Sequence, residues 1–169
     1  MELWDLVDEN RVPLGRTHVR GTAFAPGEYH VVVSILTVND AGQLLLTLRH
    51  PAKKDYANLW ENTAGSVLAG EDSLSGAIRE LREETGICAA AEELTLLRTQ
   101  RGRTAFVDSY VVRKSPAIAE LTMQEGETSA AKWVTLYELN QMLSNGEIAY
   151  PVARRMRQMY RELEYLLKK

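Results

Sequence analysis

The sequence predicts one domain of the α/β or α+β class, in which strands and helices interleave along the chain. Segments rich in β-branched apolar residues alternate with segments of helical periodicity. No Pro-, Gly- or Ser-rich linker and no internal repeat divides the 169 residues. The composition, 45% hydrophobic and 25% charged, is typical of a globular chain of this length. We therefore expect a single domain over residues 1–169.

The N-terminal third is expected to contain two hairpins. Residues 1–28 form a peripheral extension, in which the turn-forming types at 8–10 lie between short apolar segments. Residues 30–38 are almost continuously apolar and β-branched, as in a strand covered on both faces. After a polar turn they are expected to pair with residues 43–49. Residues 59–64 continue the strand pattern.

A helix over residues 73–85 is the most clearly defined element. Asp72 or Ser73 is suited to cap its start, and Gly86 suits the left-handed conformation that ends many helices. Its apolar residues recur at the i, i+3, i+4, i+7 spacing of one helical face: Leu74, Ala77, Ile78 and Leu81.

The C-terminal half returns to strands and then to helices. Residues 94–101 and 104–112 are expected to form a hairpin, and residues 130–134 a further strand. A capping box predicts a helix over 135–143. A last helix is expected over 150–169, with a proline in its first turn, and its apolar side is expected to pack on the domain or on a second copy in a homodimer.

Composition also limits the partners and the location of the protein. The formal charge of −3 argues against nucleic acid or a membrane surface as the main partner. The longest apolar run, residues 31–36, is far shorter than the roughly 20 residues of a membrane span. The single cysteine, Cys88, excludes an internal disulfide and indicates a reducing, cytoplasmic compartment. We expect Cys88 to be buried as a small hydrophobic residue.

Three carboxylates are expected to converge on the predicted helix. Glu80, Glu83 and Glu84 lie within an arc of about 100° on a helical wheel. Mg²⁺ prefers oxygen ligands, usually one or two carboxylates with phosphate oxygens and water. The loop over 65–70, bounded by glycines, allows close approach to a phosphate. Loop and helix together predict a metal-diphosphate site, whereas the alternative is a solvated face with arginine ion pairs.

The spacing of these residues resembles the Nudix box, and every fixed position of that motif is filled. The matching residues are Gly65, Glu71, Arg79-Glu80-Leu81, Glu83-Glu84 and Gly86-Ile87. The resemblance implies an α/β/α sandwich with a mixed sheet. The surrounding sequence further resembles the branch that includes isopentenyl diphosphate isomerase, through the opening Glu2 to Asp8, His30, Leu44 to Leu46 with Arg49, and Leu59-Trp60.

The resemblance also implies roles for the box residues. Glu83 and Glu84 match the principal metal-binding glutamates. Glu80 matches a further ligand or the general base, and Glu71 matches an auxiliary glutamate of the metal site. Arg79 is expected to orient these carboxylates. Glu80 is the favoured base, although related families place the base in other elements.

Further positions are expected to complete the site. The backbone carbonyl of Ala64 matches a position that often joins the metal shell. A glutamate before the strand that carries Trp133 commonly contributes, and both Glu125 and Glu127 are candidates, with spacing favouring Glu127. Each of these two carboxylates is also an alternative base.

Substrate contacts are expected from the strand end and from the loop before the box. Arg49 and Lys53 are placed where cations could hold a substrate phosphate. Gly65 would let the backbone approach that phosphate.

The activity implied is Mg²⁺-dependent hydrolysis of a diphosphate bond in a small nucleotide or related metabolite, with Mn²⁺ as a substitute metal. Isomerisation is rejected because neither cysteine nor histidine occurs between Trp60 and Glu84, where the isomerases carry a catalytic cysteine. Two alternatives stay open: a catalytically idle Nudix fold that senses a nucleotide, and an enzyme of isoprenoid diphosphates. The box itself does not identify the group attached to the diphosphate.

Overall fold

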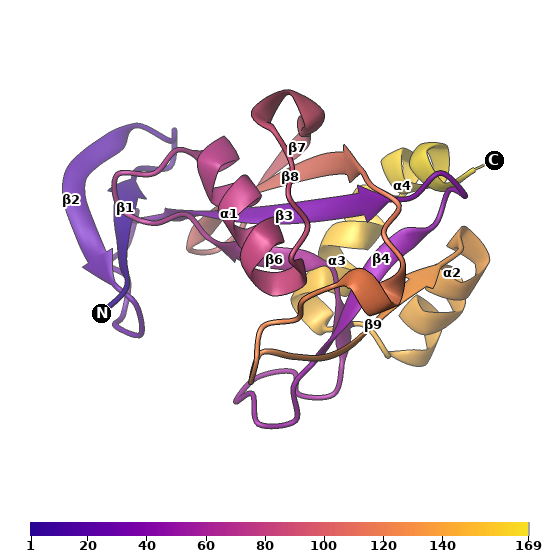
Figure 1. Cartoon of the computed structure of the whole chain (residues 1–169). Helices are drawn as coiled ribbons and strands as arrows, with labels where there is room; N and C mark the ends of the chain where they lie inside the picture. Colours follow the sequence, from indigo (N-terminus) through magenta and orange to yellow (C-terminus); the bar gives the residue numbers. More distant parts are fainter. Residues whose placement is uncertain (169) are drawn as a thin grey trace.

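In the computed structural model, which describes residues 1–168, a mixed sheet lies between helices and a two-stranded sheet projects at one end (Figure 1). The strands are β1 (Leu3–Val7), β2 (Pro13–Val19), β3 (His30–Val38), β4 (Leu44–Arg49), β5 (Trp60–Glu61), β6 (Thr63–Ser66), β7 (Thr95–Arg101), β8 (Ala105–Arg113) and β9 (Thr128–Val134). The helices are α1 (Ser73–Thr85), α2 (Leu136–Asn145), α3 (Tyr150–Gln158) and α4 (Tyr160–Leu167), with short 3-10 turns at Ala91–Glu93 and Ile118–Glu120.

Strand β3 is the centre of the mixed sheet. It pairs in parallel with β8 along its whole length and antiparallel with β6. The hairpin expected between residues 30–38 and 43–49 forms only at its closed end, where Val38 faces Leu44. Because β6 and β8 occupy both edges of β3, β4 diverges and pairs with β5 and β9 instead. The sheet therefore opens between β3 and β4.

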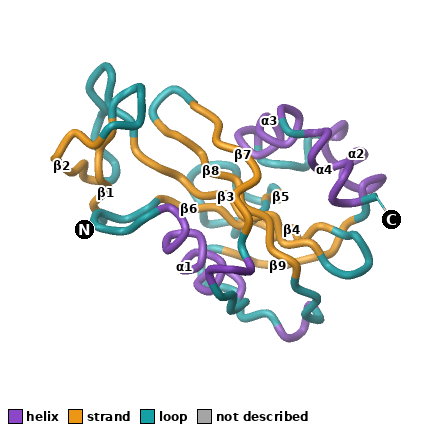
Figure 2. Tube along the Cα trace, turned by 90° about the horizontal axis from the view of Figure 1, so that it is seen from above, coloured by secondary structure: helices purple, strands orange, loops and turns teal. Residues whose placement is uncertain are grey.

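Both faces of the sheet are covered, as the sequence of β3 predicted. Val33 and Ile35 point to the core beneath α1, whereas Leu36 and Val38 point to the core formed with α2, α3 and α4. This alternation follows from the two-residue period of a strand. Figure 2 shows α1 on one side of the sheet and the three other helices on the opposite side. The α/β/α sandwich with a mixed sheet is confirmed.

The predicted helix over residues 73–85 is confirmed with the same bounds. The Asp72 carboxylate accepts a hydrogen bond of 2.7 Å from the Ser75 amide at its start. Gly86 ends the helix with φ at 75°, a conformation that side chains disfavour. Local caps thus fix the helix that carries the box carboxylates.

Two expectations about the C-terminal half were wrong. The single helix over 150–169 is two helices, because Met159 leaves helical geometry at φ −114° and ψ 29°. The break turns the chain so that Met156 in α3 and Leu163 in α4 both reach the same core. Lys169 lies outside the described residues. Cys88 is exposed rather than buried, because it lies in the irregular segment that follows the end of α1.

The N-terminal hairpin, β1 and β2, is held against the rest of the chain by backbone and side-chain contacts. Val7 exchanges backbone hydrogen bonds with Tyr29, immediately before β3. The loop between β6 and α1 is also tied to β1, because the Gly70 amide donates to the Asp5 carboxylate at 2.7 Å. Trp4 stacks on His30 with ring centroids 4.2 Å apart. The hairpin is thereby fixed beside the loop that precedes the box helix.

Within residues 1–168, no helix combines the length and the apolar character needed to cross a lipid bilayer.

Candidate metal and diphosphate site

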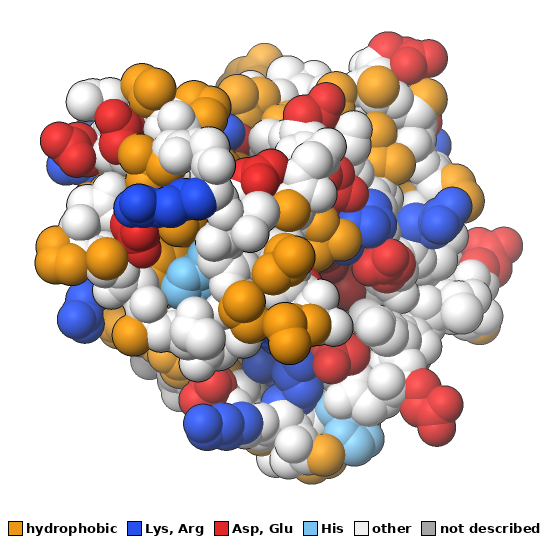
Figure 3. All heavy atoms as spheres, turned by 90° about the vertical axis from the view of Figure 1, so that its left-hand side faces the viewer, with side chains coloured by type: hydrophobic (Ala, Val, Ile, Leu, Met, Phe, Trp, Pro, Cys, Tyr) orange, Lys and Arg blue, Asp and Glu red, His pale blue; other side chains and the backbone are white. Residues whose placement is uncertain are grey.

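A cavity of about 430 Å³ lies between α1, the ends of β4 to β6, the segment before β9 and the N-terminal hairpin. Its lining is dominated by charged side chains. Viewed from the side of the hairpin, the molecule shows acidic and basic side chains close together on its surface (Figure 3). The acidic residues of the lining are Glu2, Glu61, Glu80, Glu83, Glu84 and Glu127, and the basic residues are Arg20, Arg49, Lys53 and Arg79.

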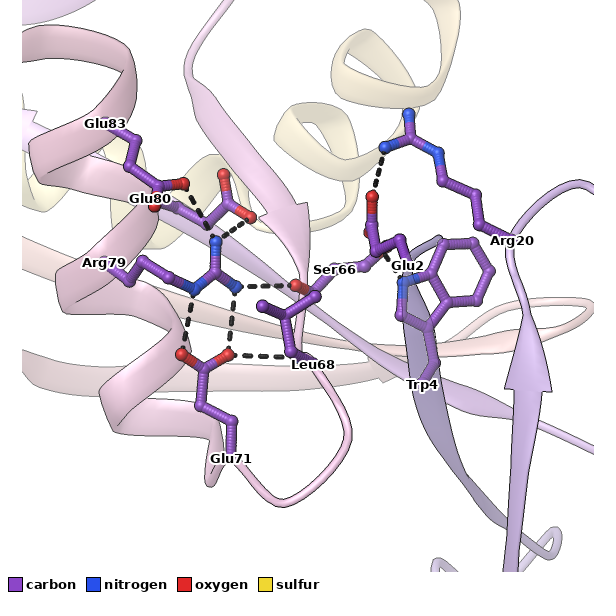
Figure 4. Close-up of polar contacts among 9 residues, drawn as sticks. All are labelled: Glu2, Trp4, Arg20, Ser66, Leu68, Glu71, Arg79, Glu80 and Glu83. Atoms are coloured by element: carbon purple, nitrogen blue, oxygen red, sulfur yellow. Dashed lines mark hydrogen bonds and ion pairs between the residues drawn. The ribbon is translucent and has the colours of Figure 1, made fainter.

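Arg79 connects three of the box glutamates (Figure 4). Its Nε and Nη2 donate to the two Glu71 carboxylate oxygens at 2.8 and 2.9 Å. Its Nη1 donates to Glu80 at 2.8 Å and to Glu83 at 3.1 Å, and Nη2 also donates to the Ser66 carbonyl. The hydrogen bonds from Arg79 lower the pKa of Glu71 below its ordinary value. One guanidinium thus joins three of the box carboxylates and the backbone before α1.

Glu80 lies directly against the backbone of Gly65. A Cβ atom at position 65 would overlap the Glu80 carboxylate, so any other residue there would force that carboxylate out of its present position. Burial raises the pKa of Glu80, and the ion pair with Arg79 opposes that rise. The glycine before the loop therefore has a packing reason in addition to the expected approach of a phosphate.

Glu84 is the carboxylate of this cavity with the least compensated charge. Burial raises its pKa well above the ordinary value, and the neighbouring Glu61 and Glu80 raise it further. Only a backbone hydrogen bond from Ala64 acts in the opposite direction among the main contributions. None of the ion pairs formed within residues 1–168 includes Glu84.

Two other acidic residues of the cavity, Glu61 and Glu127, are paired with residues predicted to bind substrate. The Arg49 Nη1 donates to both oxygens of Glu61, at 2.8 and 3.0 Å. Lys53 forms an ion pair with Glu127. Of the two candidates before β9, Glu127 lines the cavity, whereas Glu125 is exposed and does not.

The donor set fits a hard divalent cation in its chemistry. Within residues 1–168, no three acidic, histidine or cysteine side chains are close enough to share one ion as they stand. Arg79 forms ion pairs with Glu80 and Glu83, and Lys53 forms one with Glu127. To bind a metal ion, these carboxylates would have to give up their contacts with the arginine and the lysine. The unpaired Glu84, with like charges around it, would be stabilised by such a cation.

A family model described as the NUDIX domain matches residues 28–158 of the chain. An uncharacterised Nudix hydrolase of Listeria monocytogenes is 38% identical over 148 residues, which span 87% of this chain and 88% of that protein. The chain belongs to the Nudix hydrolase family. An isopentenyl-diphosphate Delta-isomerase of Pectobacterium atrosepticum is also similar, at 40% identity over 93 residues, or 54% of this chain and 51% of that enzyme.

Solved Nudix structures share the fold. A Deinococcus radiodurans protein, DR0079, superposes with a TM-score of 0.74 at 23% identity, covering 91% of this chain and 98% of that one. A bifunctional NMN adenylyltransferase/ADP-ribose pyrophosphatase of Francisella tularensis, complexed with AMP and a Mn ion, gives a TM-score of 0.63 at 20% identity. This match covers 84% of this chain and 43% of that one. Because both identities are below 25%, these structural matches support the fold of this chain and nothing beyond it.

Several residues of the cavity lining were not predicted from the sequence, among them Glu61, Glu2, Trp4 and Arg20. Glu61 had a local signal, because it is the one acid of the strand-like segment 59–64. Glu2, Trp4 and Arg20 had none, because the N-terminal hairpin is brought to the box only by tertiary contacts. Four aromatic residues that could offer a stacking face to a nucleobase do not line the cavity: Tyr29, Tyr56, Trp60 and Phe106.

Proposed function

We propose that this Nudix hydrolase cleaves a diphosphate bond in a nucleoside di- or triphosphate or in a nucleoside diphosphate derivative, with Mg²⁺ as its metal and Mn²⁺ as a substitute. One observation carries the proposal. The uncompensated Glu84 lies in a charged cavity beside Glu80, which Arg79 and Gly65 hold in place. A half-buried carboxylate among like charges favours a divalent cation, and that cation can in turn compensate the charge of a diphosphate.

Glu80, Glu83 and Glu84 would hold the metal, with Glu127 and the Ala64 carbonyl at the edge of the same cavity. Glu71 would act through Arg79, because both of its oxygens accept from that guanidinium. When bound, Mg²⁺ supplies charge neutralisation of the diphosphate and lowers the pKa of water.

The chain's own residues would orient the substrate and accept the proton. Glu80 is the favoured base, because burial raises its pKa and a carboxylate with a higher pKa takes a proton from water more readily. Glu127 lies in the same cavity and is the alternative base. Arg49 and Lys53 would turn from Glu61 and Glu127 toward the phosphate oxygens, which also present paired acceptors to a guanidinium.

The lining of the cavity supports a polar substrate. Only Trp4, Ala64 and Leu68 contribute apolar side chains to it among the described residues, which disfavours the long apolar chain of an isoprenoid diphosphate. The structural neighbour named as an ADP-ribose pyrophosphatase supports the inclusion of nucleoside diphosphate derivatives in any substrate panel. The complete set of box glutamates argues against an idle nucleotide sensor.

Chromatographic detection of the phosphorylated products across a panel of nucleoside di- and triphosphates, nucleotide sugars, dinucleotides and isoprenoid diphosphates, with and without Mg²⁺, tests the proposal. We expect turnover of a nucleotide substrate only with metal. Glu83→Gln and Glu84→Gln should each lower the rate by roughly 10²–10³-fold, as expected for the loss of a charge-stabilising group. Both variants should keep the circular dichroism spectrum of the unmodified protein.

Glu92→Gln is the matched control, because Glu92 is an exposed glutamate outside the cavity. Its activity should equal that of the unmodified protein. Full activity in both Glu83→Gln and Glu84→Gln would contradict the assignment. Tight nucleotide binding without turnover of any substrate would favour the sensor instead.

A further inference from the structure

We infer that Arg20, which follows β2 in the N-terminal hairpin, binds the terminal phosphate of the substrate and so selects diphosphates that end in a free phosphate. The inference rests on the proposed function and adds a specificity-determining residue from outside the Nudix box. Arg20 lines the same cavity as Glu80 and Glu84. It belongs to a different wall of that cavity, since the hairpin faces α1 there (Figure 4).

The three arginines of the cavity differ in how many hydrogen-bond donors remain for a ligand. All three guanidinium nitrogens of Arg79 donate within the protein, to Glu71, Glu80, Glu83 and Ser66. Those of Arg49 donate to Glu61 and to the Asp55 carbonyl. Within residues 1–168, Arg20 uses only Nη1, which donates to Glu2 at 2.6 Å. Its Nε and Nη2 are therefore available to a ligand.

Exposure of the three side chains follows the same order. The Arg20 side chain is 62% exposed, against 20% for Arg79 and 19% for Arg49. A guanidinium with two donor nitrogens free and open to solvent matches the paired oxygens of a phosphate. Arg79 and Arg49 would first have to release the carboxylates that they hold.

Contacts with Glu2 keep Arg20 from moving as freely as an ordinary surface arginine. The Glu2 carboxylate accepts from Arg20 through one oxygen and from the Trp4 indole nitrogen, at 2.7 Å, through the other. The Arg20 amide also donates to the Glu2 carbonyl at 3.0 Å. Trp4 itself is buried and stacked on His30. This series of contacts holds the guanidinium at the cavity before a ligand arrives, which lowers the entropy lost on binding.

Charge explains why a terminal phosphate should gain most from Arg20. A terminal phosphate carries close to two negative charges at neutral pH, because its second pKa is about 6. A phosphate esterified on both sides carries one charge and has one fewer free oxygen. Since Arg49 and Lys53 lie at the strand end and Arg20 on the hairpin, the two sets of cations would bracket opposite ends of the diphosphate.

Binding of two ligands by the full-length protein tests this inference. Isothermal titration calorimetry in the presence of Mg²⁺ would compare a methylene-bridged nucleoside diphosphate, which ends in a free phosphate, with a nucleotide sugar. Arg20→Gln should weaken binding of the first ligand roughly tenfold or more, the size of a lost charged hydrogen bond, and change that of the second much less. In turnover, KM for a nucleoside diphosphate should rise by a similar factor while kcat changes little.

Arg16→Gln is the matched control. Arg16 is an exposed arginine of β2 that pairs with Glu28 and does not line the cavity. Its affinities should equal those of the unmodified protein, and thermal unfolding should show that both variants are folded. Arg20→Lys, which keeps the charge but loses the paired donors, should restore part of the affinity.

Equal affinity of Arg20→Gln and the unmodified protein for the methylene-bridged ligand would overturn the inference. An equal loss for both ligands would overturn the selection of terminal phosphates. If the unmodified protein turns over a diphosphate and Arg20→Gln does so with the same KM, only this inference fails. If the unmodified protein neither binds nor cleaves any member of the panel, the proposed function fails with it.

Discussion

Asp108 in β8 is buried and Glu84 in α1 is half-buried in the cavity wall, and the two carboxylates differ in what surrounds them. Asp108, only 1% exposed, accepts hydrogen bonds from Arg11 at 2.7 Å, from Thr99 at 2.6 Å and from the Ser73 hydroxyl. Burial alone would raise its pKa, but these hydrogen bonds lower it below the ordinary value. Glu84 has acidic neighbours instead, and its pKa rises.

The difference separates a carboxylate that the protein itself satisfies from one whose negative charge the protein leaves uncompensated. Asp108 is fully satisfied by the protein, since Arg11 supplies the compensating charge and joins the turn of the N-terminal hairpin to the sheet. Glu84 is compensated by no cation within residues 1–168, and its environment favours a ligand that brings positive charge. Substitutions of the two residues should therefore have opposite effects on the metal-free protein.

Asp108→Asn should give the largest loss of stability. It removes the partner of Arg11 and leaves the Ser73 and Thr99 hydroxyls with a weaker acceptor, so the free energy of unfolding should fall by about 3 kcal/mol. Urea denaturation measures this change. Thr99→Val, which removes a single hydrogen bond to Asp108, should lower the free energy of unfolding by about 1 kcal/mol. An unchanged urea midpoint for Asp108→Asn would contradict this prediction, because it would mean that the hydrogen bonds to Asp108 contribute nothing to stability.

Lowering the pH should gradually remove the stability that Asp108 contributes, and this effect should be smaller than that of Asp108→Asn. A carboxylate with a lowered pKa in the folded state stabilises the protein above its unfolded pKa, and this contribution is lost as the pH falls through the folded value. Melting temperatures of the unmodified protein and Asp108→Asn, measured from neutral pH to below about pH 4, should therefore converge. A gap that widens in acid would contradict the assigned direction of the pKa.

A feature of this fold could be predicted from the sequence when the residues that determine it lie close together along the chain. The box helix was predicted with its bounds because Asp72, the apolar stripe and Gly86 lie within a few turns of one another. The convergence of Glu80, Glu83 and Glu84 follows from the same helical period. The α/β or α+β class followed from the interleaved strand and helix patterns, whereas the mixed sheet was expected only from the resemblance to the Nudix family.

Features that depend on contacts between residues distant in sequence could not be predicted. The divergence of β3 from β4 depends on which strands occupy the edges of β3, and pairing partners distant in sequence have no local signal. Arg20 reaches the cavity only because β1 is fixed beside the loop that precedes α1. The ion pairs of Arg49 and Lys53 with Glu61 and Glu127 likewise join residues from separate elements.

Thermal unfolding of the unmodified protein and Glu84→Gln, each with and without Mg²⁺, tests the central claim most directly. The raised pKa of Glu84 means that the folded state loses stability as the pH rises from the ordinary glutamate range to the raised value. Without metal at neutral pH, Glu84→Gln should therefore be at least as stable as the unmodified protein. Mg²⁺ at about 100 times its dissociation constant should stabilise the unmodified protein by about 2.7 kcal/mol and Glu84→Gln far less. Equal stabilisation of both proteins by Mg²⁺, or a metal-free Glu84→Gln that unfolds well below the unmodified protein, would contradict the account.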